Sequence, residues 1–423
     1  MNNYNKALDY LSCAALRGSK LGLERITDLM HRLGDPQNTV RIIHVAGTNG
    51  KGSFGAMLSA VLTDAGFSTG WFSSPALTGV TDSFRINGCE VSRDTFGNVM
   101  AEIIPVCEIM DDKPTEFEVL TAAAYLLFAR QNCQFAVVEC GMGGDSDSTN
   151  VISAPFLSVI TNVQLDHTGF LGSTISEIAE HKSGIIKLHR PVVTGASGIA
   201  LDVIARKAAD LSAELVCADL SRLHTVSADL SGVTLYDNAF GQLTIPLLGS
   251  YQSQNTAIVL TAVDVMRRYG TVIPDSAVFS GLGKTRWHGR FELLRKDPCV
   301  IYDGAHNPDG IRSAADSIRR FFPNSKFVLL IGVMADKEYQ LYADTLGPAI
   351  FRAFTVRPNN PRALDAASLA DTLRLQGVDA VPCNDLSYGV TQAFLCARNE
   401  RLPLIALGSL YMYADFVNAL DNM

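Results

Sequence analysis

Apolar residues along this chain follow two different periods on either side of a cluster of glycines. Residues 42–45 form a short apolar run that is typical of a buried strand. From Phe54 onward apolar residues recur every three to four positions, which predicts a helix with one apolar face. Three glycines separate the two patterns: Gly47, Gly50 and Gly52. The pattern therefore predicts a strand, a tight turn and a helix in succession.

The turn carries candidate chemistry, because residues 41–53 read RIIHVAGTNGKGS. Glycines let backbone amides approach phosphate oxygens, and the positive end of the helix dipole favours an anion there. Lys51 can neutralise phosphate charge, and Ser53 is placed to reach a phosphate or its Mg²⁺. The ordinary P-loop has Ser or Thr directly after the lysine, whereas Gly52 intervenes here. We predict a phosphate-binding loop, with a glycine-rich turn of no function as the alternative.

The remaining pattern predicts an α/β protein. Residues 1–40 are helical, and the turn formers at 73–88 predict a mobile surface loop. Short apolar runs at 191–248 predict a β-rich edge. Further apolar runs, separated by helical stretches, predict the strands of parallel sheets: 68–72, 135–138, 157–161, 299–302, 327–331, 354–356, 380–383 and 404–407.

Length, charge and composition restrict the classes of protein to which the chain can belong. A chain of 423 residues exceeds one ordinary core, so two domains are expected. A net charge of −8 without any basic run argues against a nucleic-acid partner. No apolar run is long enough for a membrane helix and the start is polar, so we expect a cytoplasmic enzyme. The nine cysteines form no CxxC pair, which argues against a disulfide framework or a zinc ribbon.

Two further residues are candidates on chemical grounds. Glu139 ends an apolar strand directly before CGMGGDSDSTN, where a carboxylate could hold Mg²⁺ beside the turn or could cap a helix. Thr174 and Glu177 form a capping box for a helix that projects Lys182 near this loop. An exposed lysine without a role is the alternative for Lys182.

Several segments together resemble one family. They are IHVAGTNGKGS, TEFE at 115–118, LDHT at 165–168, DGAHNPDG at 303–310 and GVMADK at 332–337. The chain resembles the folylpolyglutamate synthase and dihydrofolate synthase family, which belongs with the Mur ligases. The resemblance implies a P-loop NTPase-like Mur-ligase central domain over residues 1–285 and a smaller Rossmann-like C-terminal domain over 286–423. The boundary falls at TRWHGRFE, residues 285–292.

The resemblance also implies which residues hold ATP and Mg²⁺. The implied catalytic residues are Lys51, Lys182 and His306. The implied ATP-binding residues are Thr48, Asn49, Gly50, Lys51, Gly52, Ser53, Asn255, Arg290 and Asp303. The implied metal ligands are Ser53, Ser74, Glu139, His167 and Lys182, the last as a carbamylated lysine.

The implied substrate-binding residues are Lys20, Leu21, Thr115, Glu116, Phe117, Glu118 and Ser146. The implied reaction is ATP-dependent addition of L-glutamate to a reduced folate, to dihydropteroate, or to both, through an acyl phosphate, by a monomer. Four positions depart from the family pattern: Ala76 replaces a histidine, Asp145 and Ser146 replace arginine and leucine, and His181 replaces a glutamate.

Two other functions are also compatible with the sequence. One is a Mur-type ligase acting on a UDP-muramoyl acceptor, which the short stretch before the first strand disfavours. The other is a nucleotide-binding paralogue without activity, which the presence of Lys51, Glu139 and His306 disfavours.

The first prediction concerns Lys51. Replacing it with alanine removes the cation that faces the transferring phosphoryl group, so we expect Lys51→Ala to lose ATP turnover and to retain its fold. Phosphate release and circular dichroism of the purified variant check both parts. Turnover close to that of the unmodified protein would refute this role.

Overall fold

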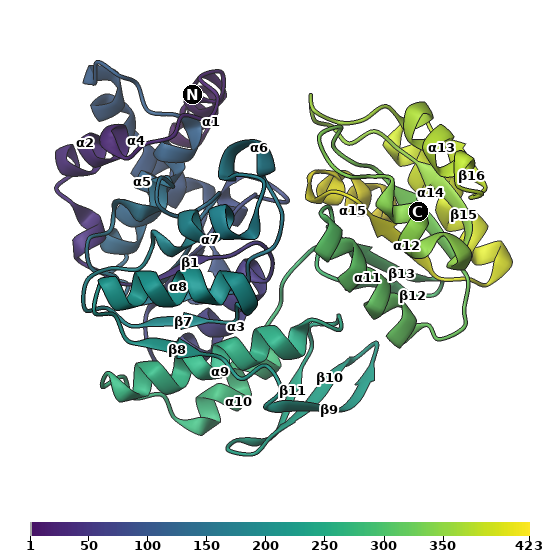
Figure 1. Ribbon diagram of the computed structural model, residues 1–423. Coiled ribbons are helices and arrows are strands. Elements are labelled where there is room, and N and C mark those ends of the chain that lie inside the picture. Colours follow the sequence, from purple (N-terminus) through teal and green to yellow (C-terminus); the bar gives the residue numbers. More distant parts are fainter. Residues whose placement is uncertain (1) are drawn as a thin grey trace. The chain divides into compact units, whose positions relative to one another are not determined.

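The computed structural model describes residues 2–423, which divide into two compact units. The first unit contains the chain up to Leu223, residues 237–243 and residues 254–285. The second contains residues 224–236, 244–253 and 286–423. Each unit is built on a sheet of its own, coloured purple to green in the first and green to yellow in the second (Figure 1).

The first unit has an eight-stranded sheet in the order β4-β3-β2-β5-β1-β6-β7-β8. The six strands from β2 to β8 in this order run parallel, while β3 and β4 add an antiparallel edge. The strands are β1 (Arg41–Ala46), β2 (Thr69–Phe72), β3 (Phe84–Ile86), β4 (Cys89–Glu90), β5 (Phe135–Glu139), β6 (Leu157–Ile160), β7 (Val192–Thr194) and β8 (Leu215–Cys217).

Helices cover this sheet. They are α1 (Asn3–Ala15), α2 (Glu24–Arg32), α3 (Lys51–Asp64), α4 (Arg93–Ile109), α5 (Glu116–Arg130), α6 (Thr168–Leu171), α7 (Ile175–Ser183), α8 (Gly198–Asp210), α9 (Gln252–Arg268) and α10 (Asp275–Lys284). Short 3₁₀ turns are η1 (Pro36–Asn38), η2 (Val80–Ser83) and η3 (Ser148–Val151). Buried side chains of α1, α2, α4 and α5 form one continuous core.

The second unit has a six-stranded sheet in the order β12-β13-β17-β14-β15-β16, parallel except for β12. Its strands are β12 (Glu292–Lys296), β13 (Cys299–Asp303), β14 (Phe327–Ile331), β15 (Ile350–Thr355), β16 (Ala380–Pro382) and β17 (Leu404–Leu407). Its helices are α11 (Pro308–Phe321), α12 (Leu341–Leu346), α13 (Ala366–Leu375), α14 (Leu386–Glu400) and α15 (Tyr413–Asp421), with 3₁₀ turns η4 (Gly347–Ala349) and η5 (Leu410–Met412). These strands alternate with helices, as the sequence pattern predicts.

Three expectations from the sequence are wrong in detail. Helix α3 is buried almost all round, Ser53 and Ser59 included, rather than on one face, because α10 packs against it. The stretch 73–88 is not simply a loop, because it contains η2 and β3, and β3 pairs with β2. Residues 191–248 contain the thirteen-residue helix α8, and a separate three-stranded sheet of β9 (Leu223–Asp229), β10 (Gly232–Asp237) and β11 (Gly241–Ile245).

All nine cysteines are free thiols, as their spacing predicts. Within residues 2–423, none of the helices combines the length and the apolar character needed to span a bilayer.

The packing of α3 against α10 generates a stability prediction. A Cβ atom on Gly281 of α10 would lie 2.5 Å from the Val61 Cα of α3, so the two backbones would have to separate. We expect Gly281→Ala to destabilise the protein by about 1–3 kcal/mol, as overpacking does. Gly169→Ala is the control, because nothing lies within 4 Å of the added atom there. Thermal unfolding of both variants measures the difference, and equal midpoints would contradict the prediction.

Candidate active site

The glycine-rich loop between β1 and α3 requires its glycines for close approach as well as for backbone conformation. Gly50 has φ 86° and precedes the first residue of α3, and a Cβ there would lie 2.5 Å from Asn255 Oδ1. A Cβ on Gly47 would collide with the Thr161 hydroxyl. The same hydroxyl donates to the Asn49 carbonyl at 2.6 Å. The loop is therefore confined by α9 on one side and by the segment after β6 on the other.

The predicted phosphate and metal residues meet at this loop. Lys51 Nζ lies 3.8 Å from Glu139 Oε1, with 16% and 7% of the two side chains exposed. Lys51 Nζ donates to the Gly47 carbonyl at 3.0 Å, and Lys182 Nζ donates to the same oxygen at 3.0 Å. Ser53, the third residue of α3, is buried. Two lysine side chains thus donate to one carbonyl and a carboxylate lies beside Lys51, an arrangement that suits both a phosphate and its divalent cation.

Lys182 is buried in the structure, so the alternative of an exposed lysine without a role does not hold. The capping box of Thr174 and Glu177 is present at the start of α7, and Lys182 in the last turn is only 4% exposed. Burial, reinforced by the charge of Lys51, lowers the pKa of the Lys182 ammonium to about 7. Near neutral pH a large fraction of this lysine is therefore an uncharged amine.

The other proposed metal ligands come from loops. Ser74 follows β2 and is half-buried, and His167 precedes α6 in a left-handed conformation with φ 51°. Asp166 Oδ2 lies 3.9 Å from His167 Nε2. Across residues 2–423 no three His, Cys, Asp or Glu side chains gather as a ready-made metal site. Mg²⁺ prefers oxygen ligands, so the Glu139 carboxylate and the hydroxyls of Ser53 and Ser74 fit it chemically.

Sequence reasoning missed a buried polar network under this loop. His44 Nε2, on β1, lies 2.9 Å from Thr149 Oγ1 and 3.2 Å from Cys140 Sγ. Thr149 in turn donates its N–H and its hydroxyl to Asp147. Burial lowers the pKa of His44 to about 3 and raises the pKa of Asp147. His44 is therefore neutral, and this network fixes residues 140–150. A histidine inside a buried strand is the only signal that the sequence contained.

The start of α5 shows what two of the predicted substrate residues do in the structure. Thr115 and Glu118 form a capping box, and the buried Glu118 carboxylate also pairs with Arg25 Nε at 3.2 Å. Arg25, on α2, is another residue that sequence reasoning missed. Phe117 packs on Gly141, where a Cβ would lie 2.7 Å from its ring.

The other predicted substrate residues at this end of the unit reach the surface. Glu116 and Leu21 are exposed, and Lys20 pairs with Asp112 at 3.5 Å. Ser146, in the loop that follows β5, is half-buried. These side chains are therefore accessible to a ligand, whereas Thr115 and Glu118 are engaged in holding the start of α5.

In the second unit, DGAHNPDG lies at the carboxyl end of β13, where ligands bind in parallel sheets. Asp303 is buried, accepts from Tyr251 Oη at 3.0 Å and from the Ala305 amide at 2.8 Å, and burial raises its pKa. The Arg290 guanidinium packs against Gly304. His306 Nδ1 lies 2.8 Å from the Gly304 carbonyl. Tyr251 was missed because its contact with Asp303 joins residues far apart in sequence.

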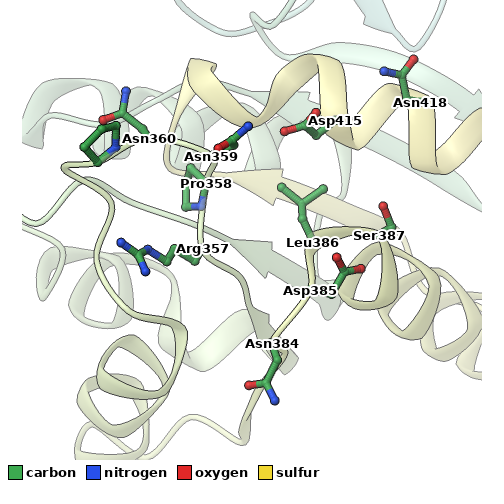
Figure 2. A pocket seen from close by; sticks show the side chains of 11 residues that line it. Arg357, Pro358, Asn359, Asn360, Asn384, Asp385, Leu386, Ser387, Asp415 and Asn418 are labelled. Carbon is green, nitrogen blue, oxygen red and sulfur yellow. The ribbon is translucent and has the colours of Figure 1, made fainter. Parts of the chain in front are cut away.

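A polar pocket of about 660 Å³ lies at the carboxyl ends of β15 and β16 (Figure 2). Asp385 and Ser387 face Asn359 and Asp415 across it, while Arg357 and Asn384 extend outward (Figure 2). None of the residues predicted from the sequence lines this pocket. Most of its side chains are exposed, so it is a shallow surface feature rather than part of the phosphate site.

Comparison with known proteins agrees with this geometry. The model of the Mur ligase middle domain matches residues 45–263, and that of the Mur ligase glutamate ligase domain matches residues 289–406. The fold and the phosphate loop thus define a Mur ligase.

Individual relatives of the chain identify the branch of the Mur ligases to which it belongs. A Bacillus subtilis protein named dihydrofolate synthase/folylpolyglutamate synthase is 35% identical, over 97% of this chain and 98% of that protein. A Lacticaseibacillus casei folylpolyglutamate synthase is 33% identical over 97% of both chains. The crystal structure of a Mycobacterium tuberculosis folylpolyglutamate synthase complexed with ADP and AMPPCP superposes with a TM-score of 0.89 at 28% identity, covering 99% of this chain and 98% of that one. The chain belongs to the folylpolyglutamate and dihydrofolate synthase family.

The burial of Lys182 generates a prediction about stability and pH. Its pKa is about 7 when folded and 10.5 when unfolded, so the unfolded state binds more protons between these values. The destabilisation that comes from burying the charged form of Lys182 is complete below pH 7 and disappears as the pH rises toward 10.5. We expect Lys182→Met to be more stable than the unmodified protein by roughly 1–3 kcal/mol at pH 6.5, and by progressively less toward pH 9.

Urea unfolding in CO₂-free buffer without Mg²⁺ or nucleotide measures this difference. His44 is present in both proteins, so its contribution to the pH dependence of unfolding cancels in the difference between them. A difference that does not change with pH would contradict the low pKa of Lys182.

Proposed function

We propose that this chain joins L-glutamate to a folate in an ATP-dependent ligase reaction. The observation that carries the proposal is the convergence of Lys51, Glu139 and Lys182 on the phosphate loop. The names of the relatives, and the ADP and AMPPCP bound in the solved one, support the same reaction.

The chemistry requires activation of a carboxylate. A substrate carboxylate oxygen attacks the γ-phosphorus of ATP, ADP leaves, and an acyl phosphate forms. The amino group of L-glutamate then attacks the acyl carbon, the new amide bond forms, and phosphate leaves together with a proton. The acyl phosphate hydrolyses readily, so the site must exclude water while it exists.

The residues of the phosphate loop have distinct roles in this proposal. Lys51 and the amides of Thr48 to Ser53 bind the phosphates, with the lysine neutralising charge that develops during transfer. Mg²⁺, when bound by Ser53, Ser74, Glu139, His167 and Lys182, would supply charge neutralisation of the phosphate oxygens. Asn255, next to Gly50, is proposed to contact the nucleotide from α9. In the second unit, Arg290 and Asp303 are proposed as ATP-binding residues and His306 as a catalytic residue.

Lys182 is proposed to act as a carbamate. An uncharged amine adds to CO₂ and releases a proton, which converts a cation into a carboxylate-like metal ligand. The low pKa of Lys182 supports this step, because it supplies the uncharged amine near neutral pH. As an ammonium ion the same side chain would repel Mg²⁺.

The acceptor is proposed to be a reduced folate, dihydropteroate, or both, as in the relatives with either name. Phe117 offers a flat ring for the heterocycle. The other residues proposed to contact the acceptor are Lys20, Leu21, Thr115, Glu116, Glu118 and Ser146. We propose that the enzyme works as a monomer in the cytoplasm, without nucleic acid or membrane as partner.

The decisive experiment measures phosphate release with ATP, Mg²⁺ and L-glutamate, using dihydropteroate, tetrahydrofolate or a UDP-muramoyl acceptor. We expect turnover with one or both pterins, a product heavier by one glutamyl residue in mass spectrometry, and none with the UDP-muramoyl compound. Omitting L-glutamate is the control for simple ATP hydrolysis. Turnover only with the UDP-muramoyl acceptor, or with none, would refute the proposal.

A further inference from the structure

Two of the positions that depart from the family pattern lie in contact. His181 Nδ1, in the last turn of α7, is 3.0 and 2.9 Å from the two carboxylate oxygens of Asp145. The Asp145 amide also donates to the His181 carbonyl at 2.9 Å. Residues 36 positions apart in the chain are thus joined by both backbone and side chains. The two departures therefore make one contact and should be treated as one change.

The backbone around this contact has no free space. A Cβ on Gly144 would lie 2.7 Å from the His181 carbonyl oxygen, and a Cβ on Gly184 would collide with Asp145. Asn150 Nδ2 donates to the Asp145 carbonyl at 2.9 Å and to the Gly184 carbonyl at 3.3 Å. The loop of residues 141–150 is therefore packed directly on the end of α7, and a shift of one would move the other.

The contact has a functional residue on each side. Lys182 follows His181 directly and reaches the Gly47 carbonyl of the phosphate loop. Ser146 follows Asp145 directly, and its amide and hydroxyl both donate to Asp145 Oδ1, at 2.7 and 3.2 Å. One carboxylate thus orients both the loop residue proposed to meet the substrate and the helix that carries the proposed metal-binding lysine.

We propose that Asp145 and His181 act as a coupled pair of positioning residues that sets Lys182 against the phosphate loop and Ser146 against the acceptor. The inference rests on the proposed roles of Lys182 and Ser146. Neither member of the pair is assigned a contact with a reacting atom.

Charge and exposure support a positioning role over a purely stabilising one. The His181 and Asp145 side chains are 35% and 44% exposed, and pairs so exposed contribute little to stability. Two further acids lie near His181 on α7: the Glu177 carboxylate is engaged with Thr174 and Ser173, and Glu180 pairs with Arg206 at 3.4 Å. The resemblance to the family implies arginine and glutamate at positions 145 and 181, so a polar pair can occupy this contact in either order.

A double-mutant cycle tests the pair. Its variants are Asp145→Asn, His181→Ala, the two combined, and the reversed pair Asp145→Arg with His181→Glu. We expect each single variant to lower kcat/KM about tenfold, because small displacements at a reacting site are costly. The double variant should lose no more than the worse single variant, and the reversed pair should recover most of the activity. His181→Asn should also recover activity in part, because its amide nitrogen can replace Nδ1.

Two readouts separate positioning from folding. Labelling with ¹³CO₂ followed by NMR reports how much of Lys182 is carbamylated in the absence of substrate, and we expect this fraction to fall in the single variants. The thermal midpoint should stay unchanged. His31→Ala is the matched control, because His31 forms an exposed histidine–aspartate pair with Asp35 at 3.2 Å on α2 and should affect neither readout.

Two results would refute the coupled positioning role of Asp145 and His181. One is additive losses of activity in the cycle. The other is single variants that match the unmodified protein in kinetics and in carbamate signal. Lys182→Gln distinguishes this failure from failure of the proposed function. If Lys182→Gln keeps full turnover, the role of Lys182 is wrong, and the positioning inference falls with it. If Lys182→Gln is inactive while the pair variants behave normally, only the pair is refuted.

Discussion

Two lysine side chains, Lys51 and Lys182, donate to a single carbonyl, that of Gly47, and the chemistry of the first unit's site depends on this arrangement. Burial removes the charged Lys182 side chain from water, and repulsion by Lys51 adds to that cost. The pKa of Lys182 falls as a result. A bound phosphate would offset the repulsion between the two lysines, and a divalent cation would pair with the Glu139 carboxylate.

The segment of residues 140–150 connects this site to the rest of the unit. Its inner side is fixed to β1 by the neutral His44 and by Thr149, and Phe117 of α5 packs on Gly141. Its outer side is fixed to α7 through Asp145. The helix proposed to touch the acceptor and the helix that carries Lys182 therefore both pack on one short loop.

The second unit is simpler, because most of its site lies on one sheet edge. Asp303 is the last residue of β13 and His306 lies three residues further on, so an apolar run that ends in DGAHNPDG was enough to predict their location. The burial of Asp303 and its raised pKa were not predictable in the same way. Its raised pKa comes from burial, and its Tyr251 partner belongs to a segment more than fifty residues earlier.

The sequence by itself determined the α/β class, most strands, the phosphate loop and the identity of the candidate residues, because these depend on local periodicity and on contiguous motifs. It was wrong about α8, about the stretch 73–88 and about the exposed side of α3, since pairing and packing partners decide those features. Only the tertiary structure decided that Lys182 is buried, that Glu118 caps a helix while pairing with Arg25, and that Asp145 meets His181. The physical reason is that burial, pKa and ion pairing arise from residues distant in the chain, and no local pattern encodes which of them will meet.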